Sequence, residues 1–190
     1  ELTKPELLAP AGSLDCFHAA IEAGADAIYL GLDEFNARLR AKNFSLKTLS
    51  YLVPFAHKKN VKIHITLNTL IKQHELQHVI YTLFQLEQLE IDAVIVQDLG
   101  IAQIITRYFQ KIPLHASTQM VVHNTACATA LEKIGMRRLI LARELTLTEI
   151  QEIKKTINIE LEVFIHGTLC FSISGLCLAS SYIGGSSGNR

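Results

Sequence analysis

Several residue types and patterns are scarce or missing in this 190-residue chain, and each absence excludes a class of protein. There is no tryptophan, and no apolar run approaches the roughly 18 residues that a membrane-spanning helix needs. The N-terminal stretch lacks the basic and apolar regions of a signal peptide. Lys+Arg and Asp+Glu both number 18, so the formal net charge is +0. A uniform basic field for nucleic acid is therefore absent, and any such contact requires a local patch.

Cysteine is also sparse. Four cysteines in a chain of this length are too few for a disulfide scaffold, so we expect a reducing cytoplasmic setting with free or metal-bound thiols. The P-loop and GxGxxG motifs are missing, which removes the commonest nucleotide-binding signatures. Asp33 and Glu34 are adjacent carboxylates in a predicted loop, where solvation is the expected state.

What the chain does contain is a globular composition, 49% apolar and 19% charged, of a size suited to one domain. Short β-rich runs alternate with amphipathic segments of helical length. The predicted strands are residues 6–12, 27–32, 61–68, 93–98, 113–119, 138–144 and 161–167. The predicted helices occupy the intervals between them, with Ser13, Ser45, Asn124 and Thr146 as N-caps and Gly24 and Gly135 as stops.

This alternation predicts a parallel α/β architecture, because parallel strands need a crossover between them. A TIM-like (β/α) barrel, cut short at about seven strands, fits better than an open doubly wound sheet, which normally carries a glycine-rich loop after its first strand. A complete barrel takes about 250 residues. We therefore expect residues 1–190 to form a single barrel-like N-terminal domain of a longer protein. Unpaired strand edges at an open seam would favour a homodimer.

Polar residues gather at the carboxyl ends of the predicted strands. Alternation places His64, Thr66 and Asn68 on one face of the third strand. The ends of parallel strands in a barrel converge on one rim, where such enzymes hold their sites. The pattern therefore predicts a ligand site on that rim. Its other strand-end residues are His115, Ser117, Gln119, Gln97, Asp98, Arg143, Glu144 and His166.

The amides and the adjacent ion pair on this rim have different expected roles. Asn68 and Gln119 do not titrate, so we expect them to hydrogen bond a substrate or an oxyanion. Arg143 and Glu144 remain open between a structural ion pair and a part of the site.

Two histidines and two cysteines need separate interpretations. His64 lies early in its strand and is predicted to be a core histidine. His166 lies at a strand end, four residues before Cys170, and is predicted to be functional. Cys170 and Cys177 are open to three interpretations: buried thiols, a nucleophile activated by His166, or half of a metal site. No third group that would orient a thiol–imidazole pair is evident, which weakens the nucleophile.

A basic cluster of Arg38, Arg40 and Lys42 lies in the loop after the second predicted strand, on the same rim. It is either a solvated loop or a clamp for the phosphates of a nucleic acid or an anionic metabolite. Arg137 and Arg138 lie near the opposite rim and are not assigned to the site.

Several motifs together resemble peptidase family U32, the collagenase-like peptidases, along essentially the whole chain. They are PELLAPAGSLDCFHAAIEAGADAIYLG, VQDLGI, LHASTQ, LARELTLTEI and FIHGTLCFSISGLC. The segments YLVPFAHKKNVKIHITLNT, IDAVIVQDLGI and SSGNR are most similar to the bacterial branch that hydroxylates a cytidine of 23S ribosomal RNA. A sister branch hydroxylates a wobble uridine of transfer RNA. The resemblance implies hydroxylation of an RNA base; a peptidase and a non-catalytic binding module with structural cysteines stay open.

The resemblance also implies a 4Fe–4S cluster held by four cysteines. Cys170 and Cys177 fall on two of the ligand positions, and the other two are expected beyond residue 190. Since such a cluster usually takes four thiolates, we expect it to be absent or incomplete in this fragment. Cys16 and Cys127 match no ligand position and are expected to be small core thiols on helices.

The implied partners are ribosomal or transfer RNA and a small anionic metabolite, with prephenate as a co-substrate and no membrane. On this interpretation Arg38, Arg40 and Lys42 hold phosphates. The catalytic candidates, which would surround the base or the metabolite, are Asn68, Gln119, Arg143, Glu144 and His166.

Overall fold

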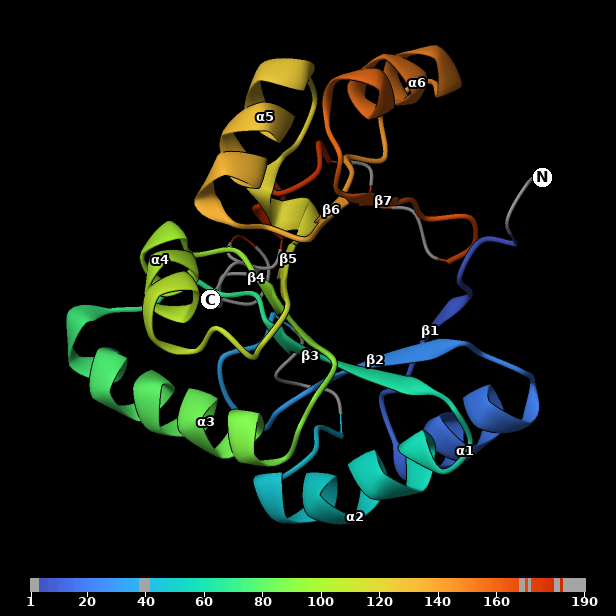
Figure 1. Ribbon diagram of the computed structural model, residues 1–190, viewed down its shortest axis with the longest axis vertical. Helices are drawn as coiled ribbons and strands as arrows, with labels where there is room; N and C mark the ends of the chain where they lie inside the picture. The colour runs from blue at the N-terminus through green and yellow to red at the C-terminus, as the bar shows by residue number, and fades with distance from the viewer. Residues whose placement is uncertain (1–3, 38–41, 168–169, 171, 180–181, 183–190) are drawn as a thin grey trace.

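The computed structural model describes residues 4–37, 42–167, 170, 172–179 and 182. Its parallel strands pair in sequence order, and Figure 1 shows the sheet curling with the helices outside it. The strands are β1 (Leu8–Pro10), β2 (Ala27–Gly31), β3 (Lys62–Leu67), β4 (Ala93–Val96), β5 (Leu114–Ala116), β6 (Arg138–Ile140) and β7 (Glu160–Glu162). The helices are α1 (Leu14–Glu22), α2 (Leu46–His57), α3 (Leu76–Gln88), α4 (Leu99–Tyr108), α5 (Thr125–Ile134) and α6 (Leu147–Thr156). Two short 3₁₀ helices, η1 (Gln73–Glu75) and η2 (Thr118–Met120), complete the set within the described residues.

The predicted order of strands and helices is confirmed, and so are the predicted N-caps. The side chains of Ser13, Ser45, Asn124 and Thr146 each accept a hydrogen bond from a backbone N–H in the first turn of the following helix. These caps satisfy amides that the helix itself leaves without partners, which is why the helix starts were readable from local sequence.

Three predicted strands extend too far at their carboxyl ends. β6 ends at Ile140 and not at residue 144, so Arg143 and Glu144 lie in the segment that follows it. β5 ends at Ala116, because Ser117 caps η2 through a hydrogen bond from Gln119 N–H to Ser117 Oγ. Gln119 therefore lies in a 3₁₀ turn and does not continue the strand face of His115. β7 ends at Glu162, and His166 lies in the exposed segment that follows it.

The two faces of the sheet differ in chemistry. Ile63, Ile65 and Leu67 of β3 belong to the apolar core that packs against the helices. Alternation puts His64 and Thr66 on the opposite, inner face. Barrel interiors are usually filled by bulky branched side chains, so this inner face is unusually polar.

His64 and His115 meet on the inner face. Their ring centroids lie 4.9 Å apart in an edge-to-face arrangement, and the residues are 1% and 5% exposed. Neither Nδ1 atom has a hydrogen-bond partner among the described residues. Burial lowers the pKa of His64 to about 4 and that of His115 to about 2, so both rings are neutral at pH 7. The prediction of a core histidine at position 64 is confirmed.

Arg138 forms a buried ion cluster at the amino ends of the strands, away from the predicted rim. Its guanidinium lies 2.7 Å from Glu6, 2.6 Å from Glu160 and 3.3 Å from Glu162. Glu6 also lies 2.6 Å from Lys62 of β3. Because Glu6 precedes β1, the cluster joins the first strand to the last two although no β1–β7 pairing occurs in the described part of the chain.

Among the described residues, no helix has the length and apolar character needed to cross a bilayer.

Candidate functional site

The loop after β2 is held by two asparagines. Asn68 Oδ1, just beyond β3, accepts a hydrogen bond of 3.1 Å from Ala37 N–H. The Asn36 side chain is buried and donates to the carbonyl of Leu32. A Cβ on Gly31 would lie 2.8 Å from Asn36 Cγ, so glycine leaves the space that this amide fills. Asn68 thus binds the backbone of its own chain, next to the predicted basic cluster.

The basic cluster itself is only partly described. Arg38 and Arg40 lie outside the described residues, and Lys42 is exposed. Its predicted contact with phosphates stays a prediction.

A second set of contacts holds residues 170 and 172–177, which we call the cysteine loop. Arg143 Nε and the Arg143 backbone N–H both donate to Ser174 Oγ at 3.2 Å, and Arg143 Nη2 donates to the Ser172 carbonyl at 3.4 Å. Glu144 Oε1 accepts from Ser174 N–H at 2.7 Å, and Ser174 is 1% exposed. Among the described contacts these two side chains bind the loop, not each other.

The two thiols of the cysteine loop lie together. The pKa of Cys170 is lowered, first by the Ser172 backbone N–H, then by the Cys177 side chain and the Arg143 guanidinium. Donors and a cation beside a sulfur favour its thiolate form, which is both a metal ligand and a nucleophile.

The cysteine loop also packs closely on the residues that follow β5. Gly175 has φ of +77°, and a Cβ there would lie 2.5 Å from Val121 Cγ2 and 2.7 Å from the Gln119 carbonyl oxygen. Val121 is itself left-handed, at φ of +58°. A β-branched residue is rarely found in that region, so tertiary contacts hold it there. The backbone of Gln119 therefore contacts the cysteine loop.

Sequence reasoning missed His123 and Ser174. His123 Nε2 lies 3.3 Å from Glu144 Oε2, and Nδ1 lies 3.1 Å from the Val121 carbonyl oxygen. Burial raises the pKa of Glu144, but hydrogen bonds from its own amide and from Ser174 outweigh this and lower it overall. No local pattern marks either residue, because their partners are distant in sequence.

Other predicted residues lie apart from these contacts. His166 is exposed and makes no hydrogen bond or ion pair within the described residues, so a Cys170–His166 dyad has no support there. Cys127 packs against the apolar core as predicted. Cys16 is exposed, which contradicts the prediction of a core thiol, because it lies on the outer face of α1.

The donor set fits half of a cluster site. Cys170 and Cys177 supply two thiols within reach of each other, whereas four thiolates usually hold an iron–sulfur cluster. Among the described residues, no group of three or more metal-ligating side chains gathers.

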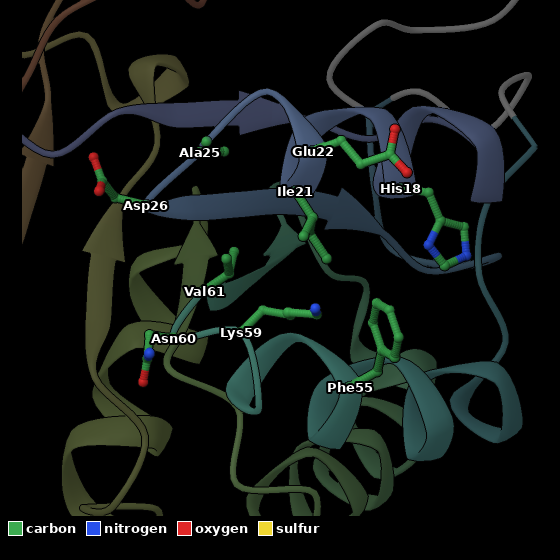
Figure 2. A pocket seen from close by; sticks show the side chains of 10 residues that line it. His18, Ile21, Glu22, Ala25, Asp26, Phe55, Lys59, Asn60 and Val61 are labelled. Carbon is green, nitrogen blue, oxygen red and sulfur yellow. The ribbon is translucent and has the colours of Figure 1, made fainter.

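A pocket of about 530 Å³ lies elsewhere, between α1 and α2 (Figure 2). Its lining includes His18 and Glu22 of α1, Phe55 of α2, and Lys59. It borders residues that precede β2 and β3, so it lies at the amino ends of these strands, opposite the cysteine loop.

Comparison with known proteins finds one matching family and several relatives. The model of peptidase family U32 matches residues 12–190. The chain is 42% identical to uncharacterized protease MJ0090 of Methanocaldococcus jannaschii, over 97% of this chain and 46% of that protein. It is 42% identical to the Escherichia coli 23S rRNA 5-hydroxycytidine C2501 synthase over 97% of this chain and 28% of that protein. It is 38% identical to the Helicobacter pylori tRNA hydroxylation protein P over 100% of this chain and 45% of that protein.

The chain thus spans less than half the length of these curated relatives. Among solved structures, the U32 peptidase Mk0906 superposes with a TM-score of 0.74 at 16% identity, covering 86% of this chain and 69% of that one. This likeness supports the barrel-type fold alone.

Proposed function

The chain belongs to peptidase family U32, and from this premise we propose that it works within an enzyme that hydroxylates an RNA base, with a cytidine of 23S ribosomal RNA as the first candidate substrate. The observation that carries the proposal is its similarity, along nearly its whole length, to a protein named as a 23S rRNA 5-hydroxycytidine synthase. Similarity to a tRNA hydroxylation protein makes transfer RNA the second candidate.

Two groups of residues on the rim at the carboxyl ends of the strands have roles in this proposal. Arg38, Arg40 and Lys42 bind RNA phosphates, and Asn68 holds the segment that leads to them through Ala37. Gln119 lies against the cysteine loop and faces the base or an anionic co-substrate such as prephenate. His166, exposed beyond β7, is a further candidate for contact with that substrate.

A 4Fe–4S cluster is part of the proposal. Cys170 and Cys177 would supply two of its thiolates, and Arg143 and Glu144 hold the loop that carries them. When bound, the cluster supplies electron transfer. Arg143 also favours the thiolate of Cys170, the form that ligates metal.

Mass spectrometry of RNA nucleosides tests the reaction. Ribosomal and transfer RNA are digested from a strain that lacks the gene and from strains complemented with the wild type or Cys170→Ser. We expect 5-hydroxycytidine to vanish from ribosomal RNA in the deletion strain and to return only with the wild type. Unchanged ribosomal cytidine hydroxylation would refute the first candidate. Loss of a hydroxylated transfer RNA nucleoside instead would select the second.

Spectroscopy of the intact protein tests the cluster. Anaerobic purification is expected to give a coloured protein whose iron content falls in Cys170→Ala and Cys177→Ala. A colourless, iron-free protein under these conditions would contradict the cluster and favour a binding module with structural cysteines.

A thiol peptidase is the second candidate function, and the lowered pKa of Cys170 is the observation that favours it. Incubation of the intact protein with collagen tests it. Cleavage that Cys170→Ala abolishes without loss of bound metal would replace the hydroxylase with a peptidase; we expect no cleavage.

A further inference from the structure

His123 lies between two hydrogen-bond acceptors. On one side the Val121 carbonyl oxygen is 3.1 Å from Nδ1, and on the other a carboxylate oxygen of Glu144 is 3.3 Å from Nε2. A carbonyl oxygen only accepts, and so does an ionised carboxylate. Glu144 is ionised at neutral pH because its pKa is lowered.

A neutral imidazole carries one N–H and can donate to only one of these acceptors. The imidazolium carries two and satisfies both, and its charge also interacts favourably with the Glu149 carboxylate of α6. The arrangement is therefore complete only when the His123 ring is protonated.

The other carboxylate oxygen of Glu144 holds the cysteine loop. It accepts from the backbone N–H of Ser174, a residue that is 1% exposed and lies midway between the two cysteines. One carboxylate thus connects the ring of His123 with the backbone of the loop.

We propose that His123 is a positioning residue, which in its imidazolium form fixes Glu144 and through it the cysteine loop. This inference deepens the proposed function, because it assigns control of the geometry of the two thiols to a residue outside the loop. The role of His123 is to orient Glu144, and the effect on the thiols passes through Ser174.

Backbone amide exchange of Ser174 in the intact protein measures the contact directly, because this N–H is the one that Glu144 binds. We expect His123→Ala and Glu144→Gln each to speed its exchange by roughly two- to fivefold, the factor that a partly exposed ion pair contributes. The double variant should match the single variants, since both remove the same contact. Unchanged exchange in His123→Ala, or additive effects in the double variant, would overturn the proposal.

His57→Ala is the matched control. His57 and Asp92 form an imidazole–carboxylate pair of 2.8 Å, with side-chain exposures of 35% and 27% against 33% and 35% for His123 and Glu144. That pair lies before β3 and β4, at the other edge of the sheet. His57→Ala should leave Ser174 exchange unchanged; acceleration there would show a general loosening and count against the proposal.

A conservative variant separates positioning from a merely structural role. His123→Gln keeps a side chain of similar reach but cannot form an imidazolium, so it should not restore the Ser174 protection that His123→Ala loses, with β3 amides as the reference for global opening. Ser174 protection in His123→Gln that matches the wild type would refute the role of the imidazolium.

Amide exchange needs neither RNA nor bound iron. If RNA hydroxylation fails its own test while Ser174 exchange responds as described, the positioning role of His123 stands and the proposed function is refuted. If hydroxylation is found and Ser174 exchange does not respond, the proposed function stands and the positioning role of His123 is refuted.

Discussion

Gly175 is the residue at which the cysteine loop touches the segment after β5. Gly175→Ala should lower the free energy of unfolding by about 1–3 kcal/mol, because the added Cβ meets the Gln119 backbone as well as Val121 and must displace one of them. Displacement of the loop should also raise the rate at which iodoacetamide alkylates Cys177 in metal-free protein. Urea unfolding and peptide mass spectrometry measure the two effects.

Gly24→Ala separates backbone strain from overlap. Gly24 has φ of +83°, close to that of Gly175, but no atom lies within 4 Å of a Cβ built there. Gly24→Ala should lower the free energy of unfolding by only the roughly 1 kcal/mol that the left-handed backbone conformation costs an alanine. It should leave the alkylation rate of Cys177 unchanged. Equal costs at the two glycines would show that the close packing of the cysteine loop contributes nothing.

Asn68 offers a second test of a single residue, because its observed partner is an amide of its own chain. Asn68→Asp keeps an oxygen that accepts from Ala37 N–H, whereas Asn68→Ala removes it. The exchange rate of the Ala37 amide should rise in Asn68→Ala, by the amount that corresponds to a loss of about 1 kcal/mol in the free energy of local opening. In Asn68→Asp this rate should stay near that of the wild type. RNA hydroxylation should follow the same order. Lost activity with intact Ala37 protection in Asn68→Asp would instead show that the amide contacts the substrate.

At the scale of the elements, Arg138 joins β6, β7 and the segment before β1. Arg138→Met should lower the free energy of unfolding by about 3–5 kcal/mol, because Glu162 stays buried without its cation and Glu6 keeps only Lys62 as a partner. Equilibrium urea denaturation measures the loss. Lys4→Met is the control, since Lys4 pairs with Asp26 at side-chain exposures of 76% and 39% and should cost less than about 1 kcal/mol. Similar losses in the two variants would mean that the buried cluster does not hold the elements together.

The elements themselves were largely readable from sequence because their signals are local. Ser13, Ser45, Asn124 and Thr146 mark helix starts within three residues of the amides they cap. The end of β5 was not readable, because Ser117 belongs equally well to a strand face and to the cap of a 3₁₀ turn.

The candidate site was predictable in position but not in its contacts. Parallel strands bring their carboxyl ends together, so Arg143 and Glu144 could be placed on the rim from sequence. Their partner Ser174 is 31 and 30 residues away, and no periodic pattern links them. His123 was missed for the same reason: its role depends on where Glu144 lies in the folded chain.

At the scale of the whole molecule, the polar inner face of the sheet should make the protein sensitive to acid. His64 and His115 have pKa values of about 4 and about 2 in the folded protein, against 6.5 for an ordinary histidine. Below pH 6.5 the unfolded chain therefore binds protons that the folded protein does not. Burial is the main cause for both rings, and the charge of Arg138 lowers both pKa values further. The negative charge of Glu6 raises them only in part.

The free energy of unfolding should consequently fall as the pH drops from about 6.5 towards 4, by at most about 1.4 kcal/mol per pH unit for each histidine. Burial opposes the ionisation of Glu6, but Arg138 and Lys62 outweigh it and lower the pKa of Glu6 to about 2. Glu6 therefore adds a further loss of stability as the pH falls below its ordinary pKa of 4.5.

Urea denaturation at pH 7, 6, 5 and 4 measures the slope. The double variant His64→Gln/His115→Gln should flatten it between pH 6.5 and 4.5, where Glu6 does not yet titrate. Exposed His74, replaced by alanine, should leave the slope unchanged. A wild-type stability that is constant from pH 7 to 5, or an equal slope in the double variant, would show that the two buried rings are already protonated or hydrogen-bonded in the folded protein.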